Sequence, residues 1–111
     1  MKKLKPNAIP DEVLDFALNE MQKILSGEVV FVAQDGRLMQ VELTQRRRLV
    51  DWSEKISAWS EDVRTHLREK IAHEFSTLLY GRLVIKIQKG RVSQIERTVQ
   101  SRFTGLDGEG I

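Results

Sequence analysis

Two stretches of this chain alternate between apolar and polar residues in the manner of β-strands. Residues 81–102 contain two runs rich in Val and Ile, and a Gly-containing turn at Lys89-Gly90 separates them, which is the pattern of a β-hairpin. Residues 27–48 repeat this pattern at a constant offset of 54 positions without a gap. Such self-similarity predicts a duplicated hairpin. The matched pairs are Gly27/Gly81, Val30/Val84, Gln34/Gln88, Gly36/Gly90, Arg37/Arg91, Gln40/Gln94, Glu42/Glu96, Thr44/Thr98 and Arg48/Arg102.

Apolar residues at helical spacing precede each predicted hairpin. Before the first, Pro10 suits a first helical turn and Ser26-Gly27 a helix end, which predicts a helix over 11–25. Before the second, Ser60 is a predicted N-cap and Gly81 the stop. Such stripes either pack on a core or bind a partner; we favour packing, because the hairpins need a cover. The stripes are Val13, Leu14, Ala17, Leu18, Met21, Ile24 and Leu25, then Val63, Leu67, Ile71, Phe75, Leu78 and Leu79.

The turn decides which side chains of a hairpin face the core. A two-residue turn pairs Ala33 with Leu38 and needs positive φ at both turn residues, which Lys89-Gly90 suits poorly. A three-residue loop closed by a bulge asks positive φ of the glycine alone, so we predict this loop in both hairpins. The predicted inward residues are Val29, Phe31, Ala33, Met39 and Val41 in the first hairpin and Leu83, Ile85, Ile87 and Ile95 in the second, with Val84, Lys86, Val92, Gln94 and Glu96 outward.

Residues 50–64 connect the two units and carry both tryptophans. Trp52, Ile56 and Trp59 are spaced i, i+4, i+7, which predicts a short helix. Two tryptophans on one helical face serve either as packing or as a platform on which bases stack. We favour packing, and keep Trp52 and Trp59 as candidates for contact with a partner.

Two units of helix and hairpin predict an α+β fold. The hairpins are expected to join as one four-stranded antiparallel sheet that the helices cover on its apolar face, with a pseudo-two-fold axis relating the units. Residues 1–111 then form a single domain with repeats at 11–49 and 65–103. The remaining segments are the connector 50–64 and a flexible tail at 104–111.

The duplicated positions also carry a family resemblance. Glycine, glutamine, arginine and glutamate recur in both hairpins, at Gly27/Gly81, Gln34/Gln88, Gly36/Gly90, Arg37/Arg91, Gln40/Gln94 and Glu42/Glu96. This pattern resembles the small uncharacterised bacterial YezD-like family, a domain of unknown function usually found as one copy. The resemblance covers both repeats, but neither the connector nor the tail. It implies a helix-plus-hairpin unit and no known activity.

Composition narrows the class of protein. A chain of 111 residues without cysteine has length for one domain and has no thiolate chemistry or disulfides. It contains no apolar run near the roughly 18 residues of a membrane span and no apolar signal-peptide region in its first ten residues. We therefore expect a cytoplasmic protein without a membrane partner.

Signatures of enzymes are weak. His66 and His73 lie seven residues apart without a third ligand at metal-binding spacing, and the glycines read as turn glycines. Glu42 and Glu96 would make a paired-carboxylate site, but each lies beside a duplicated Arg and Gln, where ion pairing is the commoner role. We expect no enzyme activity, no metal and no cofactor.

Positive charge is concentrated in the hairpins. Residues 81–103 carry six Lys and Arg against Glu96, a balance of +5, although the whole chain carries +2. The first hairpin ends in Arg46-Arg47-Arg48. Such a patch either contacts nucleic-acid phosphates, with duplex DNA the expected partner, or only solubilises the sheet and protects its edges. The candidate nucleic-acid-binding residues are Arg37, Arg46, Arg47, Arg48, Lys86, Lys89, Arg91, Arg97 and Arg102.

A protein-interaction module is the alternative function. In that hypothesis the sheet edges, or Trp52 and Trp59 of the connector, contact a protein partner or a second copy of the chain. Salt dependence separates the two functions, because nucleic-acid binding weakens steeply with added salt and an apolar interface does not.

Overall fold

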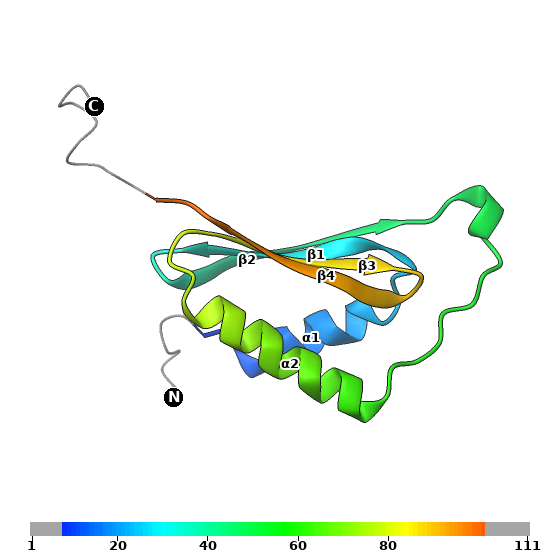
Figure 1. Ribbon diagram of the computed structural model, residues 1–111, viewed down its shortest axis with the longest axis horizontal. Coiled ribbons are helices and arrows are strands. Elements are labelled where there is room, and N and C mark those ends of the chain that lie inside the picture. Colours follow the sequence, from blue (N-terminus) through cyan, green and yellow to red (C-terminus); the bar gives the residue numbers. More distant parts are fainter. Residues whose placement is uncertain (1–7, 102–111) are drawn as a thin grey trace, which may run out of the picture.

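The computed structural model describes residues 8–101, which form a four-stranded antiparallel sheet with two helices packed on one face (Figure 1). The strand order is β2-β1-β3-β4, so the two hairpins meet through β1 and β3. The predicted α+β architecture is therefore confirmed; the predicted tail 104–111 lies outside the described residues. The elements are α1 (Asp11–Met21), β1 (Ser26–Gln34), β2 (Arg37–Arg46), the 3-10 turn η1 (Leu49–Asp51), α2 (Glu61–Ser76), β3 (Gly81–Gln88) and β4 (Arg91–Val99).

Local signals set the ends of both helices. Ser60 caps α2 as predicted, because its Oγ accepts a hydrogen bond from the amide of Val63 at 3.2 Å. Helix α1 ends at Met21, earlier than the predicted 25. The amide of Ile24 donates to the carbonyl of Met21 at 3.1 Å, so the chain tightens into a turn that still buries Ile24 and Leu25.

The core lies between the sheet and the two helices. Strands β1 and β3 are central, and their register places Val30 opposite Val84. Two residues of the predicted apolar stripes are exposed instead. Leu79 follows the end of α2 at Ser76, where helical spacing no longer applies, and Val63 borders an open pocket. Buried positions include Leu14, Ala17, Leu18 and Met21 of α1, Leu67, Ile71 and Phe75 of α2, Val29, Phe31 and Ala33 of β1, and Leu83, Ile85 and Ile87 of β3.

The predicted three-residue loops are wrong, because both hairpins close with two-residue turns. Lys89 and Gly90 have φ of 53° and 75°, and the first hairpin has the same turn at Asp35-Gly36. The extra residue lies further along, as a bulge at Met39 in β2 and at Ser93 in β4. In consequence Leu38 and Val92 pack against the core, whereas Met39 is exposed, which reverses the prediction for Met39 and Val92.

Contacts from outside each hairpin hold these turns. The amide of Gly36 donates to the carbonyl of Leu79 at 3.0 Å, and the amide of Gly90 donates to the carbonyl of Leu25 at 2.9 Å. A left-handed conformation costs about 1–2 kcal/mol for a residue such as Lys89. The hydrogen bond to Leu25 offsets that cost, and the sequence of one hairpin cannot reveal it.

The predicted connector helix is also wrong. Within residues 50–64 the helical structure before α2 is limited to the end of η1, and the chain is otherwise irregular up to Ser60. Trp59 is half-buried, and its Nε1 donates to the carbonyl of Gly90 at 2.8 Å, whereas Trp52 is exposed. Figure 1 shows the path of the connector, which leaves the end of the sheet and loops back to the helical layer. The two tryptophans therefore share no common face.

Candidate binding surfaces

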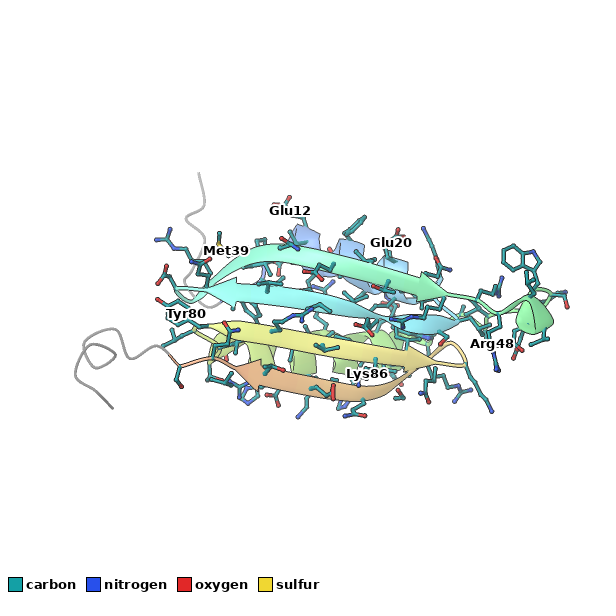
Figure 2. All side chains as sticks on the ribbon, turned by 90° about the horizontal axis from the view of Figure 1, so that it is seen from above. Glu12, Glu20, Met39, Arg48, Tyr80 and Lys86 are labelled. Carbon is teal, nitrogen blue, oxygen red and sulfur yellow. The ribbon has the colours of Figure 1, made fainter. Side chains whose placement is uncertain are left out.

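The open face of the sheet carries charges that offset one another. Figure 2 looks onto this face, which the helices leave uncovered. Lys86 pairs with Glu96 at 3.0 Å between Nζ and Oε2, and Arg82 pairs with Glu42 at 3.5 Å. Arg46 and Glu28 form a third, longer pair at 3.7 Å. Exposed pairs of this kind add little stability, but they leave this face close to neutral.

The other predicted cations are spread over the molecule. Arg97 points to the helical side, where its Nη1 lies 3.7 Å from Oε2 of Glu74. Arg37 lies beside the β1–β2 turn, at the opposite end of the sheet from Arg48. Arg91 lies near the start of α2, and Arg102 is outside the described residues. The eight candidates within residues 8–101 therefore do not form one surface.

Four of them converge at one end of the sheet. Arg46, Arg47, Arg48 and Lys89 line a cavity of about 400 Å³ where β2 ends and the β3–β4 turn lies, and we call this cluster the arginine end. Asp51 and Glu54 also line it; Arg48 pairs with Asp51 at 3.3 Å, and Arg47 Nη2 donates to the carbonyl of Glu54 at 2.6 Å. Arg47 Nε is buried and has no hydrogen-bond partner within residues 8–101.

The connector exposes an apolar tip beyond this cluster. Leu49, Val50 and Trp52 are 85%, 83% and 64% exposed, and we call these three residues the connector tip. A backbone hydrogen bond closes this turn, because the amide of Trp52 donates to the carbonyl of Leu49 at 3.2 Å. In Figure 2 the tip extends past the strands, with Arg48 at its base. Single exposed apolar side chains are ordinary, but three within four positions on a projecting turn make a candidate contact surface.

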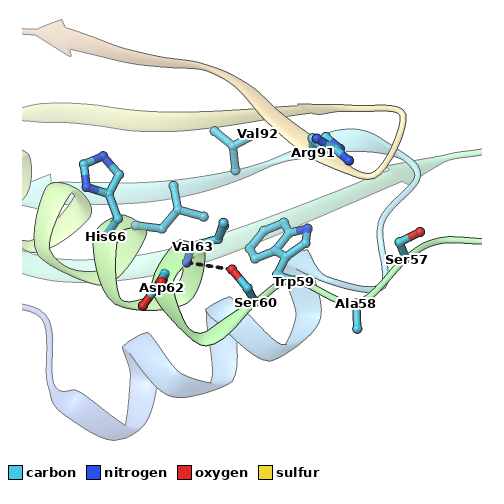
Figure 3. Close-up of a pocket in the computed structure, with 10 residues that line it drawn as sticks. Ser57, Ala58, Trp59, Ser60, Asp62, Val63, His66, Arg91 and Val92 are labelled. Atoms are coloured by element: carbon cyan, nitrogen blue, oxygen red, sulfur yellow. Dashed lines mark hydrogen bonds between the residues drawn. The ribbon is translucent and has the colours of Figure 1, made fainter.

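A pocket of about 600 Å³ opens beside the first turn of α2. Figure 3 shows Trp59, Val63 and Val92 around it, with Arg91 and His66 at its margin, and we call it the tryptophan pocket. The wall is of mixed character, because the pocket is also lined by Ser57, Ala58, Ser60, Asp62 and Leu67. The sequence did not predict this pocket, because its residues come from three segments that are distant in the chain: the connector, α2 and β4. The sequence prediction had placed Val63 on the apolar stripe of the helix, but this residue is exposed in the structure.

Features with catalytic potential are sparse in the described part of the chain. Residues 8–101 contain no group of three or more His, Asp or Glu side chains placed to hold a metal ion. His66 and His73 are exposed on α2. Glu42 and Glu96 are each engaged by a neighbouring cation on the sheet. Over the same residues, none of the helices has the length and apolar character needed to cross a bilayer.

These features define a small α+β protein. Residues 67–103 match the model of a family described as an uncharacterized small protein (DUF2292). The match spans most of α2 with β3 and β4, which supports for this segment the resemblance to an uncharacterised small-protein family. The match does not include residues 11–49, and the description of the matched family does not contain the YezD name. No curated protein and no solved structure matches the chain.

Proposed function

We propose that this protein is a non-enzymatic cytoplasmic binding module that engages another protein surface through its connector tip. The observation that carries the proposal is the exposure of Leu49, Val50 and Trp52 on one hydrogen-bonded, projecting turn. Burial of apolar surface favours association, and tryptophan is enriched among the residues that dominate interfaces. The neutral open face of the sheet, where each named cation has a carboxylate partner, makes phosphate binding there the weaker hypothesis.

Replacing Leu49 and Val50 by Ser should abolish capture of a protein partner without unfolding the chain. Because both side chains are more than four-fifths exposed, the double change should shift the free energy of unfolding by no more than about 0.5 kcal/mol. The measurement is a pull-down from nuclease-treated lysate, with wild type and variant compared by quantitative mass spectrometry at low and high salt.

A matched control keeps the apolar tip and changes the open-face cations Arg82 and Lys86 to Gln. This variant should retain the captured protein, and added salt should not weaken capture by wild type. Equal capture by wild type and by the Leu49→Ser, Val50→Ser variant would show that the tip is not the contact surface.

A second candidate function, binding of nucleic-acid phosphates, is favoured by the arginine end. Four cations and two carboxylates surround one cavity there, and Arg47 Nε is a buried donor without a partner among the described residues. A phosphate oxygen is the kind of charged acceptor that satisfies such a guanidinium. In this hypothesis duplex DNA binds at the end of the sheet, and not on its open face.

Changing Arg46, Arg47 and Arg48 to Gln tests this second function. If the arginine end binds duplex DNA, the triple variant should bind more weakly, and the slope of log affinity against log salt should flatten by about 0.9 for each phosphate that the variant no longer neutralises. The measurement is a fluorescence-anisotropy titration at two salt concentrations. The control is the double variant Arg82→Gln, Lys86→Gln of the open face, which should bind like wild type. Absence of binding at low salt would exclude the function.

We also propose that the chain is a tandem duplication of one YezD-like unit, with a pseudo-two-fold axis between β1 and β3. Support comes from the offset of 54 positions between the hairpins. Val30 and Val84, which are related by that offset, face each other across the central strand pair. The two hairpins also have the same kind of turn and a bulge at the same place, at Met39 and Ser93.

A further inference from the structure

Two apolar surfaces without a partner in the described structure lie at the same end of the molecule. One is the connector tip, and the other is the tryptophan pocket beside the start of α2 (Figures 1 and 3). The chain does not bring them together, because the tip lies at the turn of the connector furthest from the helical layer (Figure 1). A single contact between two copies would cover both.

The pocket has the character of a receptor for apolar side chains. Trp59 is held in place by two hydrogen bonds, from its Nε1 to the carbonyl of Gly90 at 2.8 Å and from its amide to Oε1 of Gln22 at 3.3 Å. Val63 is 45% exposed beside it, although it belongs to the apolar stripe of α2. Trp59, Val63 and Val92 therefore offer an apolar surface within a wall of mixed character. The two hydrogen bonds fix Trp59 before anything binds, which lowers the entropic cost of binding.

The residues of the first unit that correspond to the pocket wall can be found from the offset of 54 positions. Subtracting the offset of 54 from Val63 gives Ile9, which is 7% exposed and belongs to the core. The counterparts of Leu67 and Val92 are Val13 and Leu38, and both pack against that core. The two units therefore differ at one of these positions: Ile9 is buried in the core, whereas its counterpart Val63 is 45% exposed beside the pocket.

Charge at the two surfaces is complementary. Arg46 and Arg48 stand at the base of the tip, and the first turn of α2 beside the pocket carries Glu61 and Asp62. Arg91 at the pocket margin makes no ion pair within residues 8–101, so it is available to a carboxylate of the second copy. Docking would bring opposite charges together around an apolar centre.

We propose that the connector tip of one copy inserts into the tryptophan pocket of a second copy, and that the exchange is reciprocal. This inference rests on the proposed function and names its partner as a second copy of this chain. Because tip and pocket lie at the same end, a two-fold axis lets each tip enter the other pocket and closes the assembly as a dimer.

The absence of native cysteines allows a direct cross-linking test. A tagged Val50→Cys variant is mixed with an untagged His66→Cys variant under mild oxidation, and mixed disulfide dimers are resolved by mass. The mixture should form these dimers at least about tenfold faster than a mixture in which Gln94→Cys, on the open face, replaces the pocket variant. Each variant oxidised alone gives the background. Equal rates for the pocket and open-face positions would overturn the proposal.

Association without any cross-link provides the second measurement. Wild type should show a concentration-dependent doubling of mass in analytical ultracentrifugation, and the Leu49→Ser, Val50→Ser variant should weaken this by at least about tenfold. A chain that stays monomeric, or a dimer that persists unchanged in the variant, overturns the proposal.

If the tip contacts a different partner, the experiments give different results. A monomer that still captures a lysate protein through Leu49 and Val50 overturns self-docking and leaves the proposed function intact. A monomer whose tryptophan emission shifts to shorter wavelength on phosphatidylglycerol vesicles assigns the tip to a lipid surface, which overturns self-docking as well. The Trp59→Phe variant leaves Trp52 as the sole reporter for that measurement.

Discussion

A Gly81→Ala variant is expected to lose roughly 3–5 kcal/mol of folding free energy, because the neighbouring strand leaves no room for a methyl group. A Cβ built on Gly81 would lie 1.9 Å from the carbonyl oxygen of Thr98 in β4. That atom belongs to the backbone of the paired strand and cannot turn aside. The φ of 145° at Gly81 adds backbone strain for any residue with a Cβ. Gly27 has the same close approach to the carbonyl of Thr44.

The matched control is Gly90→Ala. Its φ of 75° is also unfavourable for alanine, but the nearest obstacle is Cγ2 of Ile56 at 3.1 Å, a side-chain atom that can move. We expect a loss of about 1–2 kcal/mol there. Urea denaturation followed by circular dichroism measures both variants. If Gly81→Ala is no more destabilising than Gly90→Ala, then β3 and β4 do not approach each other as closely as the structure indicates.

Truncating Phe75 to Ala should destabilise the protein by about 3–5 kcal/mol. Phe75 lies on the inner face of α2, is 0% exposed and belongs to the cluster that includes Phe31 and Ile85. Removing the ring forfeits its burial and leaves a cavity that the sheet and helices can only partly close. Ile85→Ala, on the facing side of the sheet, should cost about 2–5 kcal/mol for the same reason.

Phe16→Ala is the control for the loss of an aromatic ring from a helix. Phe16 lies on α1 and is 53% exposed, so its truncation should change the free energy of unfolding far less than that of Phe75. Urea melts of wild type and both variants measure the difference. A loss below about 0.5 kcal/mol for both Phe75→Ala and Ile85→Ala would mean that these residues do not form the core in solution.

The sequence alone determined the two long helices, the four strands and most of the core. Helix caps such as Ser60 act on amides within their own turn, and the spacing of Leu67, Ile71 and Phe75 follows from helical geometry, so both can be inferred from neighbouring positions. Alternation along β1 and β3 likewise identified the inward residues Phe31 and Ile85. Two hairpins with one apolar face each, and two amphipathic helices, leave few ways to bury those faces, which is why the α+β class could be predicted.

Tertiary structure decided the features from which the binding surfaces are inferred. Lys89 adopts a left-handed conformation because the adjacent amide bonds to Leu25, a residue more than sixty positions earlier in the chain. The resulting turn and bulge move Val92 inward, into the wall of the tryptophan pocket. Lys86 looked like part of a basic patch in the sequence, but its neutralising partner Glu96 lies across the strand pair.

The connector shows most clearly where local sequence patterns fail to predict secondary structure. Its apolar spacing predicted a helix, but Trp59 is held by the carbonyl of Gly90, and the chain must pass from the sheet layer to the helical layer. With this long-range contact and this chain path, Leu49, Val50 and Trp52 lie exposed on a projecting turn. Periodicity reports which residues would share a face if an element forms; contacts between distant segments decide whether it forms and what then stays exposed.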